Sequence, residues 1–123
     1  MEQKKYKLTE ETMCFDGVTL HRIQAIKDFG NVTAGELGGW VESERNLSQE
    51  GNCWINMEAK AYGYAEICDN AVLTRGAIAC ENSTIGNDAF VTDDSVIRGF
   101  TYLFGNVEVS GKSVIDGYAR LYG

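Results

Sequence analysis

His21 is the only histidine in this 123-residue sequence, and it is therefore the first candidate for a general base near neutral pH. Proton transfer by its imidazole is the chemistry that such a residue offers. It stands, however, in an alternating apolar and polar run beside Arg22. That pattern favours a surface or half-buried structural side chain on a strand. We therefore assign no catalytic residue.

Other residue combinations that carry chemistry are also missing from the sequence. Asp93 and Asp94 are adjacent and point to opposite sides of a strand, so they form no facing acid–base pair. Gly38 and Gly39 lack the strand-to-helix setting of a phosphate-binding loop. The four cysteines show neither a CxxC pair nor metal-ligand spacing, and one histidine excludes a three-histidine metal site. We predict no metal and no cofactor, and this cysteine usage suits a reducing cytoplasm.

The elements that must position any site come from a repeat of six residues. From residue 51 through residue 122, the chain divides into twelve such blocks without an insertion. The third position is always small or short, and Gly, Asn and Asp are frequent at the first, where they tolerate the positive φ of a tight corner. Alternation within a block sends positions three and five to one side of a short strand. The fifth position is always aliphatic: Ile55, Ala61, Ile67, Leu73, Ala79, Ile85, Val91, Ile97, Leu103, Val109, Ile115 and Leu121.

This pattern, as in Ile85-Gly86-Asn87-Asp88-Ala89, resembles the hexapeptide repeat of left-handed parallel β-helices. The resemblance implies three hexads for each triangular coil, and hence about four coils. A right-handed β-helix or a solenoid of another cross-section are the alternatives. We predict an all-β protein in which residues 51–123 form the β-helix of twelve hexapeptide repeats.

Residues 1–50 are predicted to form a small β-rich N-terminal cap, which protects the open end of the solenoid. Alternating residues over 5–8 and 18–23 indicate strands, with a turn at residues 15–17 between them. This segment resembles the N-terminal region of the YdcK-like β-helical proteins of bacteria and prophages. The resemblance lies in Arg22, Asp28-Phe29, Ala34-Gly35, Gly38-Gly39-Trp40-Val41, Asn46-Leu47-Ser48-Gln49 and Gly51-Asn52-Cys53-Trp54-Ile55. Those relatives run longer, so we expect either a short version or a truncated solenoid.

Three outward faces of the predicted solenoid carry apolar side chains. Clustered aromatic residues are good interface anchors, so we predict a partner or oligomer interface on what we call the aromatic face. It comprises Tyr64, Phe100, Tyr102, Phe104, Tyr118 and Tyr122. The tryptophan face comprises Trp54, Val72 and Phe90, and the valine face comprises Ile78, Val96 and Val114. The cap can instead cover the tryptophan face, and the valine face can reflect oligomer packing or simple strand propensity.

Eighteen acids against eleven bases give a net charge of −7, which argues against direct nucleic-acid binding and against a basic membrane anchor. No run suits a membrane span or a signal peptide, so we expect a cytoplasmic protein without membrane contact. A rigid acidic surface could imitate nucleic acid to a basic partner, whereas ordinary solubility is the alternative. The acidic surface comprises Glu58, Glu66, Asp69, Glu81, Asp88, Asp93 and Asp94.

The function that we predict from these features is a non-enzymatic protein-binding module, which forms a dimer or trimer. In its most concrete version, a phage or prophage encodes it to inhibit a host factor such as an anti-phage nuclease of the CRISPR type. The alternatives are an acyltransferase-like enzyme, or a self-assembling structural element. The acyltransferase is implied by the resemblance, because many hexapeptide-repeat proteins use a histidine base and an acyl-CoA donor at a cleft between subunits. One histidine, and hexads without an inserted loop, argue against an enzyme.

Overall fold

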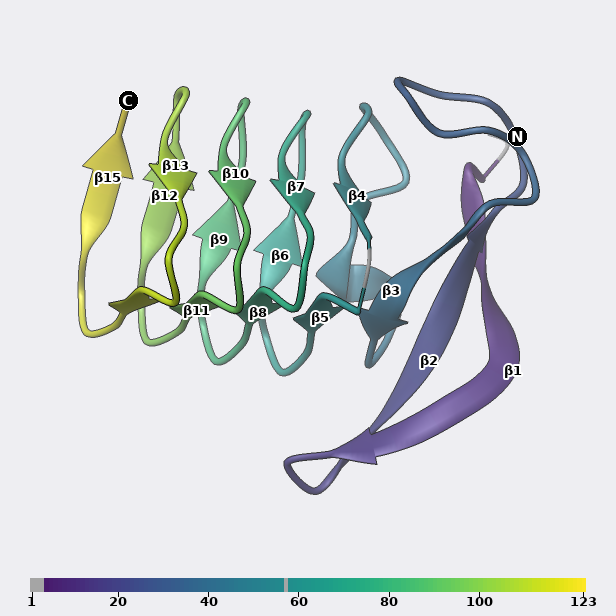
Figure 1. Ribbon diagram of the computed structural model, residues 1–123, viewed down its shortest axis with the longest axis horizontal. Coiled ribbons are helices and arrows are strands. Elements are labelled where there is room, and N and C mark those ends of the chain that lie inside the picture. The colour runs from purple at the N-terminus through teal and green to yellow at the C-terminus, as the bar shows by residue number, and fades with distance from the viewer. Residues whose placement is uncertain (1–3, 57) are drawn as a thin grey trace.

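A computed structural model describes residues 4–56 and 58–123, and in this part of the chain it is all-β apart from one short 3-10 helix. Parallel sheets stack as a β-solenoid of about five turns (Figure 1). This architecture confirms the predicted left-handed parallel β-helix with a β-rich cap. The cap lies at one end of the stack and the C-terminus at the other (Figure 1).

Each face of the solenoid is one sheet whose strands come from successive turns. The valine face contains β3 (Leu37–Val41), β5 (Lys60–Ala61), β8 (Ile78–Ala79), β11 (Val96–Ile97) and β14 (Val114–Ile115). The tryptophan face contains β4 (Trp54–Ile55), β7 (Val72–Leu73), β10 (Phe90–Val91) and β13 (Glu108–Val109). The aromatic face contains β6 (Glu66–Ile67), β9 (Thr84–Ile85), β12 (Tyr102–Phe104) and β15 (Arg120–Tyr122).

The register of these strands follows from the hexad spacing. Ile67 pairs with Ile85, and Ile85 with Leu103, so equivalent residues of neighbouring turns are 18 apart. The resulting columns of fifth-position side chains form the buried core together with the small third-position residues. In the column of Ile67, Ile85, Leu103 and Leu121, the last side chain is less buried than the others, because Leu121 is 37% exposed.

The solenoid begins earlier than the predicted hexads, which corrects the expectation of about four coils. β3 pairs in parallel with β5, Val41 opposite Ala61, and Leu47 forms a parallel bridge with Ile67. Both offsets are 20 residues instead of 18, because two extra residues lie between Leu47 and Ile55. The insertion breaks the period of six, and Arg45 is a long residue at the third position, which is small or short in the hexads. For these two reasons the repeat pattern did not predict the first turn.

The remainder of the cap is a hairpin and the segment that follows it. β1 (Tyr6–Phe15) and β2 (Val18–Ala25) are antiparallel, and Asp16 and Gly17 form the predicted turn with positive φ. β2 also pairs antiparallel with β3, so the hairpin extends the sheet of the valine face (Figure 1). The 3-10 helix η1 (Glu44–Asn46) lies between β3 and the Leu47 bridge. No helix in the described part of the chain is both long and apolar enough to cross a membrane.

Candidate functional site

The predicted aromatic residues lie on or beside the strands of the aromatic face, and the structure brings most of them into contact. Phe100 and Tyr118, one turn apart, stack with ring centroids 5.1 Å apart and planes within 5°. Phe104 stacks on Tyr102 at 6.2 Å and on Tyr122 at 5.9 Å. The Arg120 guanidinium lies over the Tyr102 ring, 5.3 Å from its centroid. The aromatic face is therefore a ladder of rings and not a set of scattered side chains.

Tyr64, the sixth residue of this set, stands apart from the stacked rings. It belongs to the same column as Phe100 and Tyr118, but Asn82 occupies the position between it and Phe100. A groove of about 380 Å³ opens here. Its lining comprises Arg45, Tyr64, Glu66, Asn82, Thr84, Phe100 and Tyr102. Tyr64 is 70% exposed and Phe100 is 46% exposed, so both rings are accessible to a ligand.

Arg45 reaches this groove from the preceding turn of the solenoid. Its Nε donates to the carbonyl of Gly63 at 3.0 Å, and its guanidinium lies 5.4 Å from the Tyr64 ring centroid. Ser43 caps η1 by accepting from the Arg45 backbone amide, and Asn46 completes a capping box. Arg45 is not among the predicted site residues, because the two-residue insertion separates it from the hexad register.

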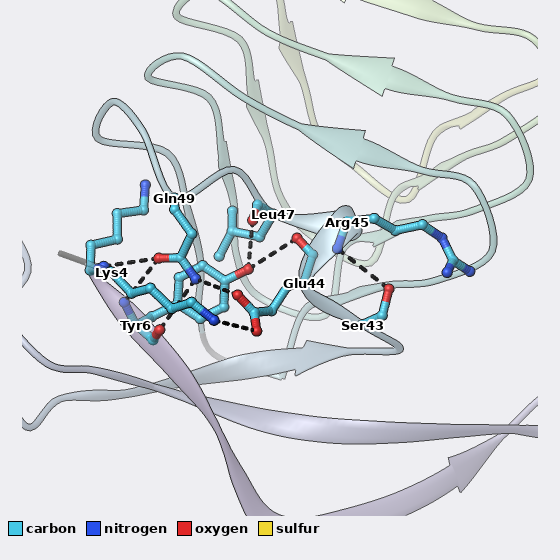
Figure 2. Close-up of polar contacts among 8 residues, drawn as sticks. Lys4, Tyr6, Ser43, Glu44, Arg45, Leu47 and Gln49 are labelled. Carbon is cyan, nitrogen blue, oxygen red and sulfur yellow. Dashed lines mark hydrogen bonds and ion pairs between the residues drawn. The ribbon is translucent and has the colours of Figure 1, made fainter. Parts of the chain in front are cut away.

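The N-terminal strand holds the segment that carries Arg45 in place (Figure 2). The Tyr6 hydroxyl donates to the backbone carbonyl of Leu47 and also lies 3.2 Å from that of Glu44. Gln49 accepts from the Lys5 and Tyr6 amides, and its Nε2 donates to Glu44. Burial raises the pKa of the Tyr6 hydroxyl, and the Glu44 charge acts in the same direction. This hydroxyl therefore stays a neutral hydrogen-bond donor.

Lys5 is buried at the junction of the cap and the solenoid, although lysine is a residue type that is seldom buried. Its Nζ donates to the Cys53 carbonyl at 2.8 Å and to the Gly51 carbonyl at 3.1 Å, and it lies 3.3 Å from Cys53 Sγ. Burial lowers the pKa of Lys5 and raises the pKa of Cys53. Because this ammonium group donates its hydrogen bonds to backbone carbonyls, we interpret Lys5 as a structural residue of the junction and not as part of a catalytic or binding site.

The cap covers one end of the tryptophan face, so Trp54 is not the exposed residue that the outward pattern predicted. Its side chain is only 3% exposed and contacts the edges of Tyr6 and Phe29, at centroid distances of 6.4 and 5.3 Å. Val72 and Phe90, further along this face, are half-buried. Covering by the cap, the alternative weighed in the sequence analysis, is thus confirmed at Trp54.

The tip of the cap hairpin contacts the valine face at the first turns of the solenoid. Phe15 packs against Tyr62 with ring centroids 6.0 Å apart, and the Tyr62 hydroxyl donates to Asp16 at 3.1 Å. Burial raises the pKa of Tyr62, and nearby Cys80 and Asp16 add to the shift. Ile78 and Val96 are half-buried and Val114 is exposed. The exposed part of this stripe is consequently short.

The predicted acidic residues are all exposed, and several of them serve the corners of the solenoid. Asp69 has φ 58° and accepts from the backbone amide of Asn87, 18 residues on, at 2.8 Å. Glu81 accepts likewise from the Gly99 amide at 2.9 Å, and Asp93 from the Gly111 amide at 3.4 Å. Glu58 binds Arg22 at 2.8 Å instead. Glu66, Asp88 and Asp94 complete the set. The carboxylates of Asp69, Glu81 and Asp93 thus join one turn of the solenoid to the next.

His21 lies on β2, opposite Thr12 of β1 and Val41 of β3, and is half-buried. Over residues 4–56 and 58–123, no group of three His, Cys, Asp or Glu side chains is arranged to hold a metal ion. All four cysteines are free. In Cys68, burial first and the neighbouring Asp69 charge second raise the thiol pKa to about 11, which makes this thiol a poor nucleophile at neutral pH.

Comparison with known proteins gives one informative likeness. No family model matches the chain. Over 122 residues it is 36% identical to a protein of Escherichia coli (strain K12) named uncharacterized acetyltransferase YdcK. That match covers 93% of this chain but only 32% of the relative, so the chain spans about a third of the relative's length. Together with the β-solenoid, this likeness confirms the predicted resemblance to YdcK and to the hexapeptide-repeat β-helix family.

Proposed function

We propose, from the likeness to the YdcK acetyltransferase, that this chain takes part in transfer of an acetyl or related acyl group. The single observation that carries the proposal is the 36% identity to this relative over 93% of the chain. This function was the alternative in the sequence analysis. The fold by itself supports no activity, since solenoids of this kind also serve in binding and assembly.

The residue that acts in this proposal is His21, the only imidazole in the chain. As a general base, it would take the proton from an acceptor hydroxyl or amine while the acceptor oxygen or nitrogen attacks the thioester carbonyl. The carbon–sulfur bond then breaks, and the proton is passed to the departing thiolate. Because His21 lies on the cap hairpin, its substrates would bind beside the first turn of the solenoid.

The experiment is turnover of acetyl-CoA by the full chain with a panel of small amine and hydroxyl acceptors, followed as release of free CoA by chromatography. We expect His21→Ala to lower the rate by roughly 10²- to 10⁴-fold. Thr19→Ala, an exposed change on the same strand, is the matched control and should retain activity. Turnover that survives His21→Ala would remove His21 from the mechanism, and no turnover with any acceptor would count against the proposal.

A second candidate function is protein binding, and the exposed ring ladder of the aromatic face favours it. Tyr118 is 81% exposed and Tyr122 is 70% exposed, although both are large aromatic side chains of the kind that anchors interfaces. The protein partner, or a second copy in a dimer or trimer, would cover this ladder. The narrower prediction of a phage-encoded nuclease inhibitor rests on charge, size and the prophage context of the family that the chain resembles, and it stays a prediction.

The test of this second function is sedimentation velocity over a range of concentrations, together with affinity capture read by mass spectrometry. Phe100→Ala, Tyr102→Ala and Tyr118→Ala combined should abolish self-association or the captured partner. Val114→Ala changes an exposed residue of the valine face and should leave both intact. If the triple variant behaves like the original chain while its circular dichroism is native, the aromatic face is not the interface.

A further inference from the structure

We propose that the gap in the ring ladder at Asn82 is a binding site for one adenine ring, inserted between Tyr64 and Phe100. The inference does not rest on the proposed acyl transfer. It rests on the column Tyr64, Asn82, Phe100 and Tyr118, in which consecutive members are one turn apart. Three of these four positions carry an aromatic ring, and the fourth carries a short amide.

The spacing of the solenoid makes this gap the thickness of one ring. Neighbouring turns lie about 4.8 Å apart, so the two positions that flank Asn82 are separated by about 9.6 Å. A planar ring midway between Tyr64 and Phe100 would then stand about 4.8 Å from each. The stacked pair of Phe100 and Tyr118, with centroids 5.1 Å apart, shows that rings at this spacing are in contact. The inserted ring would repeat that stacking on both of its faces.

The two walls of the gap are supported from outside. Phe100 is backed by Tyr118, with the ring planes within 5° of parallel. Tyr64 is contacted by the guanidinium of Arg45, which belongs to the preceding turn and is itself fixed on the Gly63 carbonyl. Each wall thus has a side chain packed behind it, and such support lowers the entropy that binding would otherwise cost.

The polar lining of the groove selects the kind of ring. Asn82, Glu66 and Thr84 line it, and within the described part of the chain none of their side chains forms a hydrogen bond. An asparagine amide pairs with adenine through N6 and N7, which are one donor and one acceptor on the same edge. The Glu66 carboxylate is an acceptor for the second N6 hydrogen. Guanine has an acceptor oxygen in place of the amino group and would face this carboxylate unfavourably.

Adenine rings occur both in free nucleosides and nucleotides and in coenzyme A, so the site would accept the ring from either source. The net charge of −7 disfavours multiply phosphorylated ligands at long range, whereas Arg45 lies in the groove lining. Adenosine therefore tests the ring site alone, and coenzyme A tests whether the phosphates are tolerated.

The experiment is a titration of the ¹⁵N-labelled full chain with adenosine, followed by amide chemical shifts. We expect saturable shifts centred on Tyr64, Asn82 and Phe100, and a markedly weaker response to guanosine. A parallel titration uses coenzyme A. If coenzyme A shifts the same amides as adenosine, the site accepts the adenine ring of an acyl donor. If adenosine shifts them and coenzyme A does not, the site binds nucleosides. Neither outcome depends on catalytic turnover.

Two variants test the geometry. Asn82→Phe completes the ladder, so we expect it to abolish adenosine binding while the spectrum stays that of a folded protein. Tyr64→Ala removes one wall at an exposed position and should weaken binding by roughly tenfold. Thr19→Ala, a change at an exposed position on the cap hairpin outside the groove lining, is the control and should leave the affinity unchanged. Adenosine shifts elsewhere on the protein, or shifts that persist in a folded Asn82→Phe variant, would overturn the proposal.

Discussion

The segment before Gly51 and the hexads after it are stabilised by different kinds of contact. In the hexads, aliphatic columns fill the interior and backbone amides bond the carbonyls of the next turn. In the cap, buried polar side chains bond backbone groups some forty residues away. Tyr6 reaches Leu47 in this way, and Lys5 reaches Cys53. Asn46, fully buried, donates to the Ala65 carbonyl at 2.8 Å.

This difference shows how the regular and irregular parts of a solenoid divide their roles. A regular turn satisfies its backbone by repetition, so any face can carry variable side chains without changing the core. The first turn has no preceding turn on which to stack, and side chains of the cap satisfy its carbonyls instead. Individual residues therefore matter more in the cap than in any single turn.

The largest effect is expected where the cap is joined to the solenoid. Tyr6→Ala removes a fully buried ring and the hydroxyl that binds the Leu47 carbonyl, and should lower the free energy of unfolding by about 3–5 kcal/mol. Urea denaturation followed by tryptophan fluorescence reports on this loss, because Trp54 contacts Tyr6. Tyr6→Phe keeps the ring and should cost only about 1–2 kcal/mol. Equal losses would show that the hydroxyl, and not the packing, stabilises the junction.

The second largest effect on stability is expected from a substitution within one interior column. Leu103→Ala empties a fully buried position and should cost about 2–5 kcal/mol in urea denaturation. Leu121→Ala makes the same change one turn later, where the side chain is 37% exposed, and should cost less than about 1 kcal/mol. A similar cost at both positions would mean that the last turn is packed more tightly in solution than in this structure.

A corner carboxylate should contribute less than either kind of packing. Asp69→Ala removes the acceptor for the Asn87 amide and places alanine at a positive φ, so we expect a loss of about 1–2 kcal/mol. Asp69→Asn keeps an acceptor oxygen and a residue type that tolerates this conformation, and thermal unfolding should show most of the stability restored. If the asparagine variant is as unstable as the alanine variant, the charge matters and not the hydrogen bond.

The smallest effect is a pH-dependent one in the cap. The hydrogen bond from Lys4 is the main cause that lowers the pKa of Glu44 below its ordinary value of 4.5. A lowered carboxyl pKa contributes stability that is present above the ordinary value and is lost as the pH falls through the lowered one. Glu44→Gln should therefore reduce stability at neutral pH by at most about 1 kcal/mol, because the pair is exposed. Urea midpoints of the two proteins should converge in acid, and a constant difference would contradict the assignment.

The sequence by itself determined the repeat, the small and aliphatic interior positions, the hairpin turn at Asp16 and Gly17, and the membership of the aromatic face. Each of these follows from local rules. Alternation fixes which side a residue takes, and a period of six fixes where the corners fall. Such rules need no knowledge of distant parts of the chain, so they can be read from one sequence.

Only the tertiary structure decided how the cap meets the first turn and which outward residues become neighbours. The pairing that reveals the two-residue insertion before Ile55, the cover over Trp54 and the burial of Lys5 all involve segments that are far apart in the sequence. The groove at Asn82 arises in the same way. Its walls Tyr64 and Phe100 come together because the stack of turns brings residues two repeats apart onto one column, and no local preference of an asparagine indicates that its neighbours in space are rings.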